Sequence, residues 1–201
     1  MEVLAVVEVA IFIVSLVGYH CYFLYRMGRK PNQVSLALNI SERNYWIRRV
    51  MSTEEPELLI IHSFRNMILG TTFLSNSSLL IAWGLLRPLL KTDDPAGVSP
   101  RILFLAAIFF VAFISFGISV RAYTQLNFIL TGFGEDSGPH LPNIHKSVFA
   151  MMTHATVFYW LGLRCFYFAL PIGLWSIGPF GLTIGTALLV LILLYNDMYS
   201  H

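Results

Sequence analysis

Apolar side chains run without interruption from Ile102 to Ile114, and polar side chains then appear within the same apolar context. The polar positions that follow are Ser115, Ser119, Arg121, Tyr123, Thr124, Gln125 and Asn127. The whole stretch, residues 102–133, is longer than the roughly 20 residues that a helix needs to cross a bilayer core. It predicts a membrane-spanning helix with an apolar half and a polar half.

The polar half of this helix carries polar groups around its circumference. At about 100° per residue, one face holds Gly117, Arg121, Thr124 and Gln125. The roughly opposite face holds Ser115, Ser119 and Tyr123. In hydrocarbon each of these groups needs a partner, and an unpaired guanidinium costs several kcal/mol. We therefore expect the other helices to encase this half.

Helical periodicity and length predict four more spans, at about 3–25, 63–86, 145–172 and 180–195. Pro171 and the pair Gly178-Pro179 mark the end of the fourth span and a tight reversal. The first span has a polar stripe at helical spacing, formed by Glu8, Ser15, Tyr19, Tyr22 and Arg26. The predicted fold class is all-α, a polytopic transmembrane helix bundle of about five spans that forms a single domain over residues 1–201.

The composition agrees with this fold, because 56% of the residues are hydrophobic, 12% are charged and the mean hydropathy is +0.68. The formal charge of +2 is too small and too scattered to favour nucleic-acid binding. Two cysteines within predicted spans provide neither a disulfide framework nor a CxxC metal site. The N-terminal apolar run lacks a basic start and a cleavage site, so we expect it to be retained as a span.

Basic residues are concentrated in one connector. Seven of the 13 lysines and arginines fall between Arg26 and Arg65. The positive-inside rule makes this connector cytoplasmic, with the N-terminus outside and the C-terminus inside. These features predict an integral protein of a bacterial-type inner or plasma membrane.

The connector contains a cytoplasmic interfacial segment, residues 27–53. Its sequence from Ile40 to Met51 predicts a short helix whose apolar face meets the membrane through Trp46, Ile47, Val50 and Met51. The spacing of Ser52 and Glu55 is that of a capping box and predicts the start of the second span.

Small residues predict close helix contacts at two places. Ser75 to Ser78, around Asn76, lie near the middle of the second span, and Gly181 and Gly185 form a GxxxG motif in the fifth. Such residues allow helices to approach closely and to form interhelical hydrogen bonds. Packing is the favoured interpretation of both.

Several strings resemble a known family. They are Trp46–Met51, Phe64–Leu80, Phe113–Tyr123 and Leu163–Trp175 followed by Gly178-Pro179. Together they resemble domain-of-unknown-function family 599, whose members are uncharacterised multi-pass membrane proteins of bacteria and plants. The resemblance covers nearly the whole chain and implies a membrane bundle without an assigned activity. The family positions that it implies are Arg65, Asn66, Arg121, Arg164, Pro171, Trp175 and Gly178.

Charged residues within the predicted spans are the candidate site residues. Counting from the span ends places Glu8 and Arg164 in the outer part of the membrane, which predicts a structural contact between them. Arg65, Asn66, Arg121 and Gln125 fall near the cytoplasmic side and predict a site for a carboxylate, a phosphate or a lipid headgroup. The alternative is that both arginines extend to the cytoplasmic membrane surface, or bond to backbone carbonyls, without a ligand. Asn76, with Glu8 and Arg164, is predicted to be a structural polar residue.

No sequence motif predicts catalysis, a metal or a cofactor. His20, His62, His145 and His154 fall toward the cytoplasmic side, but their spacings match no metal motif. Motifs for nucleophilic catalysis and for phosphate or dinucleotide binding are also absent from the sequence.

Three functions remain open at this stage. The leading prediction is a non-enzymatic membrane protein that binds or transports a small anionic ligand or lipid headgroup in an arginine-lined polar cavity. The second is a structural or accessory subunit of a membrane complex or homo-oligomer. The third is a haem-dependent or lipid-acting membrane enzyme. Membrane lipids are the expected partners, and nucleic acid is not.

Overall fold

The computed structural model describes the chain except for Met1, residues 53–56, 88–98 and 133–143, Pro179 and residues 199–201. All elements in the described residues are helical. The helices are α1 (Glu2–Arg29), the short 3-10 helix η1 (Pro31–Gln33), α2 (Ser35–Met51), α3 (Glu57–Leu86), α4 (Pro100–Thr131), α5 (Ile144–Ile177) and α6 (Gly181–Met198). This confirms the all-α fold class.

Four helical segments are long and apolar enough to cross a membrane: Val6–Arg29, Leu58–Leu86, Pro100–Thr131 and Lys146–Ile177. A fifth apolar helical segment, Gly181–Asp197, is shorter. The chain is therefore a multi-pass membrane protein, in agreement with the prediction of about five spans.

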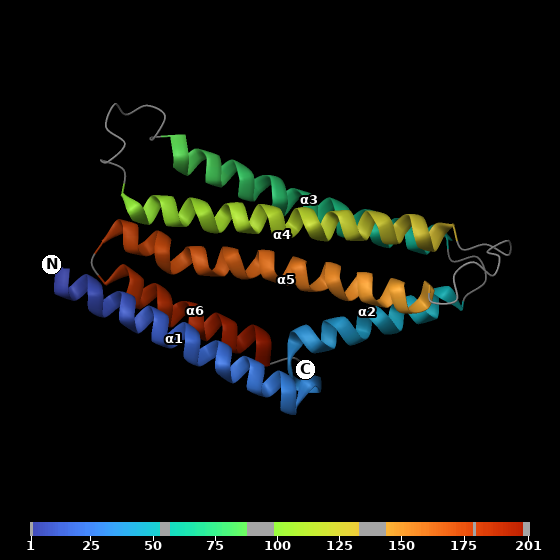
Figure 1. Cartoon of the computed structure of the whole chain (residues 1–201), viewed down its shortest axis with the longest axis horizontal. Helices are drawn as coiled ribbons and strands as arrows, with labels where there is room; N and C mark the ends of the chain where they lie inside the picture. The colour runs from blue at the N-terminus through green and yellow to red at the C-terminus, as the bar shows by residue number, and fades with distance from the viewer. Residues whose placement is uncertain (1, 53–56, 88–98, 133–143, 179, 199–201) are drawn as a thin grey trace.

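The helices form a bundle in which α4 lies between α3 and α5, with α6 and α1 on the other side of α5 (Figure 1). Helix α2 runs obliquely along one end of the bundle (Figure 1). Between α4 and α5, the hydroxyl of Ser119 donates to the carbonyl of Ala155 at 2.9 Å. Between α3 and α4, the hydroxyl of Ser75 donates to the carbonyl of Phe113 at 3.3 Å, as expected for a small polar residue in helix packing. Asn76 beside it is exposed.

Helices α3, α4 and α5 are longer than a bilayer core is thick. They contain 30, 32 and 34 residues, which at a rise of 1.5 Å gives lengths of about 45–50 Å, against roughly 30 Å for the hydrocarbon. Helix α6 has 18 residues and starts directly after α5 ends. The extra length of α5 therefore lies at its N-terminal end, the end at which α2 packs.

Helix α2 closes this end of the bundle with its apolar face. Ile47 and Val50 are 0% and 3% exposed and share a cluster with Phe64 of α3, Tyr123 of α4 and Met152 of α5. Arg43 of α2 also donates a hydrogen bond to the Tyr123 hydroxyl. The prediction that Ile47 and Val50 face the membrane is thus wrong, because the protruding halves of α3, α4 and α5 supply apolar surface for them.

Two predicted helix boundaries also change. Ser52 ends α2 as its C-cap instead of starting the second span, while Glu55 and Pro56 lie outside the described residues. Helix α5 continues through Pro171 to Ile177. A proline is tolerated inside a membrane helix where neighbouring structure accommodates the lost backbone hydrogen bond.

The GxxxG motif of α6 packs against the end of α5 of the same chain. A Cβ atom on Gly185 would lie 2.5 Å from Pro171 Cα, and one on Gly181 would lie 2.1 Å from the Leu174 carbonyl oxygen. Both positions therefore require glycine for the close α5–α6 approach.

Candidate functional site

A buried ion pair joins the last turn of α6 to the middle of α5. Arg164 Nη2 donates to Asp197 Oδ2, and the two side chains are only 3% and 6% exposed. Tyr19 of α1 also donates its hydroxyl to Asp197 Oδ2, and Ser35 at the start of α2 donates to Oδ1 at 3.4 Å. We call Tyr19, Ser35, Arg164 and Asp197 the Asp197 cluster. It connects α1, α2, α5 and α6.

Aromatic rings surround the guanidinium of this cluster. The Arg164 Cζ atom lies 4.4 Å from the ring centroid of Trp160, 5.5 Å from that of Tyr19 and 5.5 Å from that of Phe23. Trp160 and Phe23 are themselves stacked, with centroids 5.5 Å apart. Cation–π contacts of this kind strengthen when water is excluded, so the rings stabilise a charge that one carboxylate already neutralises.

Glu8 is not the partner of Arg164, contrary to the prediction from depth. Arg164 contacts Tyr19, which lies eleven residues after Glu8 on α1, so the two charges are roughly 16 Å apart along the helix axis. The error arose because depth was counted from the start of α5, part of which extends beyond the other spans. Glu8 is 4% exposed, and its Oε1 atom has no hydrogen-bond partner among the described residues.

A second polar arrangement lies in an open groove between α4 and α5, with a volume of about 590 Å³. Arg121 and Gln125 line it from α4, and Ser147 and His154 line it from α5. Within the described residues no carboxylate forms an ion pair with Arg121. The side chains of Arg121 and Gln125 are exposed on the surface of the protein. The expectation that other helices encase this half of α4 is therefore wrong for the face that carries these two residues.

Arg65 and Asn66 do not line this groove. They are exposed residues of α3, beside the buried Phe64. Arg65 lies about 21 residues before the C-terminal end of α3, and Arg121 lies about 21 residues after the N-terminal end of α4. Each separation corresponds to roughly 32 Å. The two arginines thus share a level at the α2 end of the bundle, but the structure assigns only Arg121 and Gln125 of the four predicted residues to one groove.

The match to a known family covers nearly the whole chain. Residues 7–201 match the family described as "Protein of unknown function, DUF599". The chain belongs to this family. The resemblance predicted from the sequence is therefore confirmed. No curated protein and no solved structure was found to match the chain.

Two positions implied by the DUF599 resemblance have clear structural contacts. Arg164 belongs to the Asp197 cluster. Trp175 of α5 accepts Arg101 of α4 at the other end of the bundle, where Arg101 Cζ lies 4.1 Å from the ring centroid and Nη1 donates to the Trp175 carbonyl at 3.1 Å. The sequence does not predict the hydrogen-bond partner of Arg101, because the acceptor is a backbone carbonyl and not a polar side chain.

The histidines of this DUF599 member are dispersed in the part of the chain that the structure describes. His20 Nδ1 is hydrogen-bonded to the Leu16 carbonyl, His62 is exposed and His154 lines the α4–α5 groove. The side chain of His145 lies outside the described part. No group of three or more potential metal ligands is found among the described residues.

The residues that sequence reasoning missed are Asp197 and Tyr19 as the partners of Arg164. Asp197 follows the last apolar run of the sequence, near the end that is predicted to be cytoplasmic, so the sequence predicts no contact for it inside the bundle. Two features of the sequence could have indicated these partners. Tyr19 lies on the polar stripe of α1, and a buried arginine requires a carboxylate.

Proposed function

We propose that this protein binds an anionic lipid headgroup in the groove between α4 and α5, with Arg121 as the principal contact. The observation that carries the proposal is an exposed arginine, without a carboxylate partner among the described residues, in a groove that also holds an amide, a hydroxyl and an imidazole. A guanidinium and neighbouring hydrogen-bond donors fit a phosphate group well.

The level of Arg121 supports a headgroup as the ligand. The residue lies roughly 32 Å from the start of α4, which is close to the thickness of the hydrocarbon core. The guanidinium therefore reaches the headgroup layer, while the acyl chains of the same lipid contact the apolar half of α4. By the positive-inside rule this surface is the cytoplasmic one.

The groove is open along the outer surface of the bundle, which suits a lipid that enters sideways from the membrane. The accessory-subunit function has less support, because the GxxxG motif is used for packing within the chain. A polar cavity enclosed by both Arg65 and Arg121 is not the basis of the proposal, since the two residues line different surfaces.

The test measures lipid retention by native mass spectrometry after reconstitution with phosphatidylglycerol and phosphatidylcholine. We expect Arg121→Gln to lower phosphatidylglycerol occupancy about ten-fold, since a hydrogen bond to a charged group contributes about 1.5–3 kcal/mol. Arg121→Lys should retain part of the binding. Competition with inorganic phosphate distinguishes a headgroup site from a site for the free anion.

Arg65→Gln is the matched control, because Arg65 has the same charge, is likewise exposed and lies at the same level, but is outside the groove. It should retain wild-type occupancy. Equal occupancy in wild type, Arg121→Gln and Arg65→Gln would refute the proposal. Equal loss in both variants would show that surface charge, and not the groove, holds the lipid.

A further inference from the structure

The register between α4 and α5 places Arg121 and His154 at one level of the groove that they line. The two helices run antiparallel (Figure 1), and Ser119 of α4 donates to the carbonyl of Ala155 of α5 at 2.9 Å. Arg121 follows Ser119 by two residues and His154 precedes Ala155 by one, so both lie within about 3 Å of this contact along the bundle. A guanidinium and an imidazole therefore line the groove at the same depth from its two walls.

The imidazole of His154 is available to a ligand. Its ring packs against that of Phe158, one turn further along α5, with the centroids 4.5 Å apart. In the part of the chain that the structure describes, its ring nitrogens have no hydrogen-bond partner. The phosphate of a lipid thus meets two sets of donors at this level, the guanidinium of Arg121 and an imidazole N–H.

Gln125 and Ser147 form a second, uncharged level of the groove, nearer the α2 end. Gln125 lies one turn after Arg121, about 6 Å along α4, and Ser147 lies two turns before His154, about 10 Å along α5. Because Arg121 is at the depth of the phosphate, this level is where the substituent of a phospholipid headgroup is located. A carboxamide and a hydroxyl both donate and accept hydrogen bonds, as the hydroxyls of a polyol do.

The charges near this second level disfavour a headgroup that carries an ammonium. None of the described residues that line the groove has a carboxylate. Lys146 directly precedes Ser147, and its exposed side chain adds positive charge at this end of α5. An ammonium group here would therefore meet repulsion without an acidic partner, whereas an uncharged, hydroxylated substituent meets hydrogen-bonding groups.

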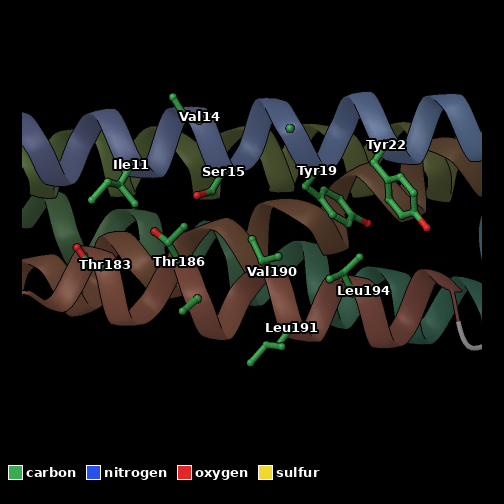
Figure 2. A pocket seen from close by; sticks show the side chains of 12 residues that line it. Ile11, Val14, Ser15, Tyr19, Tyr22, Thr183, Thr186, Val190, Leu191 and Leu194 are labelled. Atoms are coloured by element: carbon green, nitrogen blue, oxygen red, sulfur yellow. The ribbon is translucent and has the colours of Figure 1, made fainter.

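A groove of similar size between α1 and α6 lacks this arrangement. Its volume is about 610 Å³, and its walls are apolar apart from hydroxyls such as those of Ser15, Thr183 and Thr186 (Figure 2). Among the described residues no charged side chain lines it. A phosphate has a partner in the α4–α5 groove and not in this one, so the α1–α6 groove provides control positions.

We propose that the lipid bound in the α4–α5 groove is a phosphatidyl-polyol, such as phosphatidylglycerol. The phosphodiester lies between Arg121 and His154, and the hydroxyls of the polyol form hydrogen bonds with Gln125 and Ser147. This inference rests on the proposed headgroup site and adds the class of headgroup that the site selects.

The experiment compares phosphatidylglycerol with phosphatidylethanol, whose headgroup has the same phosphodiester charge and no hydroxyl. The full-length protein is reconstituted with equal amounts of the two lipids, and native mass spectrometry gives the ratio in which they stay bound. We expect the wild type to favour phosphatidylglycerol about ten-fold, the factor that two neutral hydrogen bonds supply. Glycerophosphoglycerol, the water-soluble deacylated headgroup, should not displace the lipid even in large molar excess.

Variants at the uncharged level separate the polyol from the phosphate. Gln125→Leu and Ser147→Ala should each lower the ratio about three-fold while phosphatidylethanol stays bound. Their matched controls are Asn66→Leu, at an exposed amide of α3, and Ser15→Ala in the α1–α6 groove, and both should keep the wild-type ratio. Arg121→Gln should reduce the binding of both lipids, since it removes the phosphate contact that they share.

The results distinguish failure of this inference from failure of the headgroup site. A wild-type ratio near one, with both lipids lost in Arg121→Gln, would overturn the polyol and leave the headgroup site standing. A ratio that falls equally in the variants and their controls would also overturn the polyol contacts. Unchanged binding of both lipids in Arg121→Gln would overturn the headgroup site itself. Displacement by glycerophosphoglycerol would overturn the lipid and assign the groove to a soluble phosphodiester.

Discussion

The carboxylate of Asp197 accepts hydrogen bonds from side chains of three other helices. Two of these hydrogen bonds are buried in the bundle. The sequence predicts Arg164 of the fourth span as a structural polar residue, and the structure buries its side chain among α1, α5 and α6. It did not predict the partner, because the choice between Glu8 and Asp197 depends on the relative depth of three helices. When helices are longer than the membrane is thick, the depth of a residue cannot be determined by counting residues from the end of its helix.

The ion pair can be tested by a double-mutant cycle. Removing one partner by Arg164→Met or Asp197→Leu should lower the free energy of unfolding by about 3–5 kcal/mol, because the other charge is left buried. The double variant should lose clearly less than the sum of the two changes. Unfolding in mixed detergent micelles, followed by tryptophan fluorescence, measures all four proteins. Additive losses would mean that the two residues stabilise the fold independently.

At the scale of helices, the sequence predicted the number and type of elements well, since long apolar runs have few alternative structures. The incorrect predictions concern features of the helices that depend on tertiary contacts. Helix α2 packs against protein instead of lipid, and α5 passes through Pro171. The close approach of Gly162 to the Phe116 ring, at 2.6 Å for an added Cβ atom, was also unpredicted, because a single glycine in a span has no partner visible in the sequence.

The α5–α6 contact predicts strong sensitivity at one glycine. Gly185→Leu would force a side chain into the Pro171 backbone, and overpacking of this kind costs about 1–3 kcal/mol or more. We expect a lower melting temperature and partial aggregation on size-exclusion chromatography. Gly117→Leu, with open space around its Cβ position, should melt like the wild type. A wild-type melting temperature for Gly185→Leu would contradict the described packing.

At the scale of the molecule, charge and length are arranged asymmetrically. The α2 end carries the exposed Arg65 and Arg121, as well as the protruding halves of α3, α4 and α5. The cytoplasmic side of the basic connector stays a prediction from the sequence. The sequence did not predict that the polar half of α4 extends beyond the shorter spans. That polar half is better explained by this extension than by complete burial.

Orientation is tested by cysteine labelling in a background with Cys21→Ser, since Cys21 is exposed and Cys165 is buried. Asn39→Cys on the exposed side of α2 should react with an impermeant maleimide only after the cells are permeabilised. Ala96→Cys, at a position outside the described residues, should react in intact cells. The reverse pattern would place the basic end outside.

The Asp197 cluster also imposes an order on biosynthesis. Tyr19 and Asp197 are 178 positions apart, so α1 enters the bilayer long before the carboxylate that holds it has been translated. During that interval α1 lacks both Asp197 and its neighbour α6, and the contacts open to it within the bundle are those with α5, such as Phe23 with Trp160. Its final docking consequently waits for the synthesis of α6, and a ribosome stalled before residue 197 would carry an inserted first helix without its polar anchor.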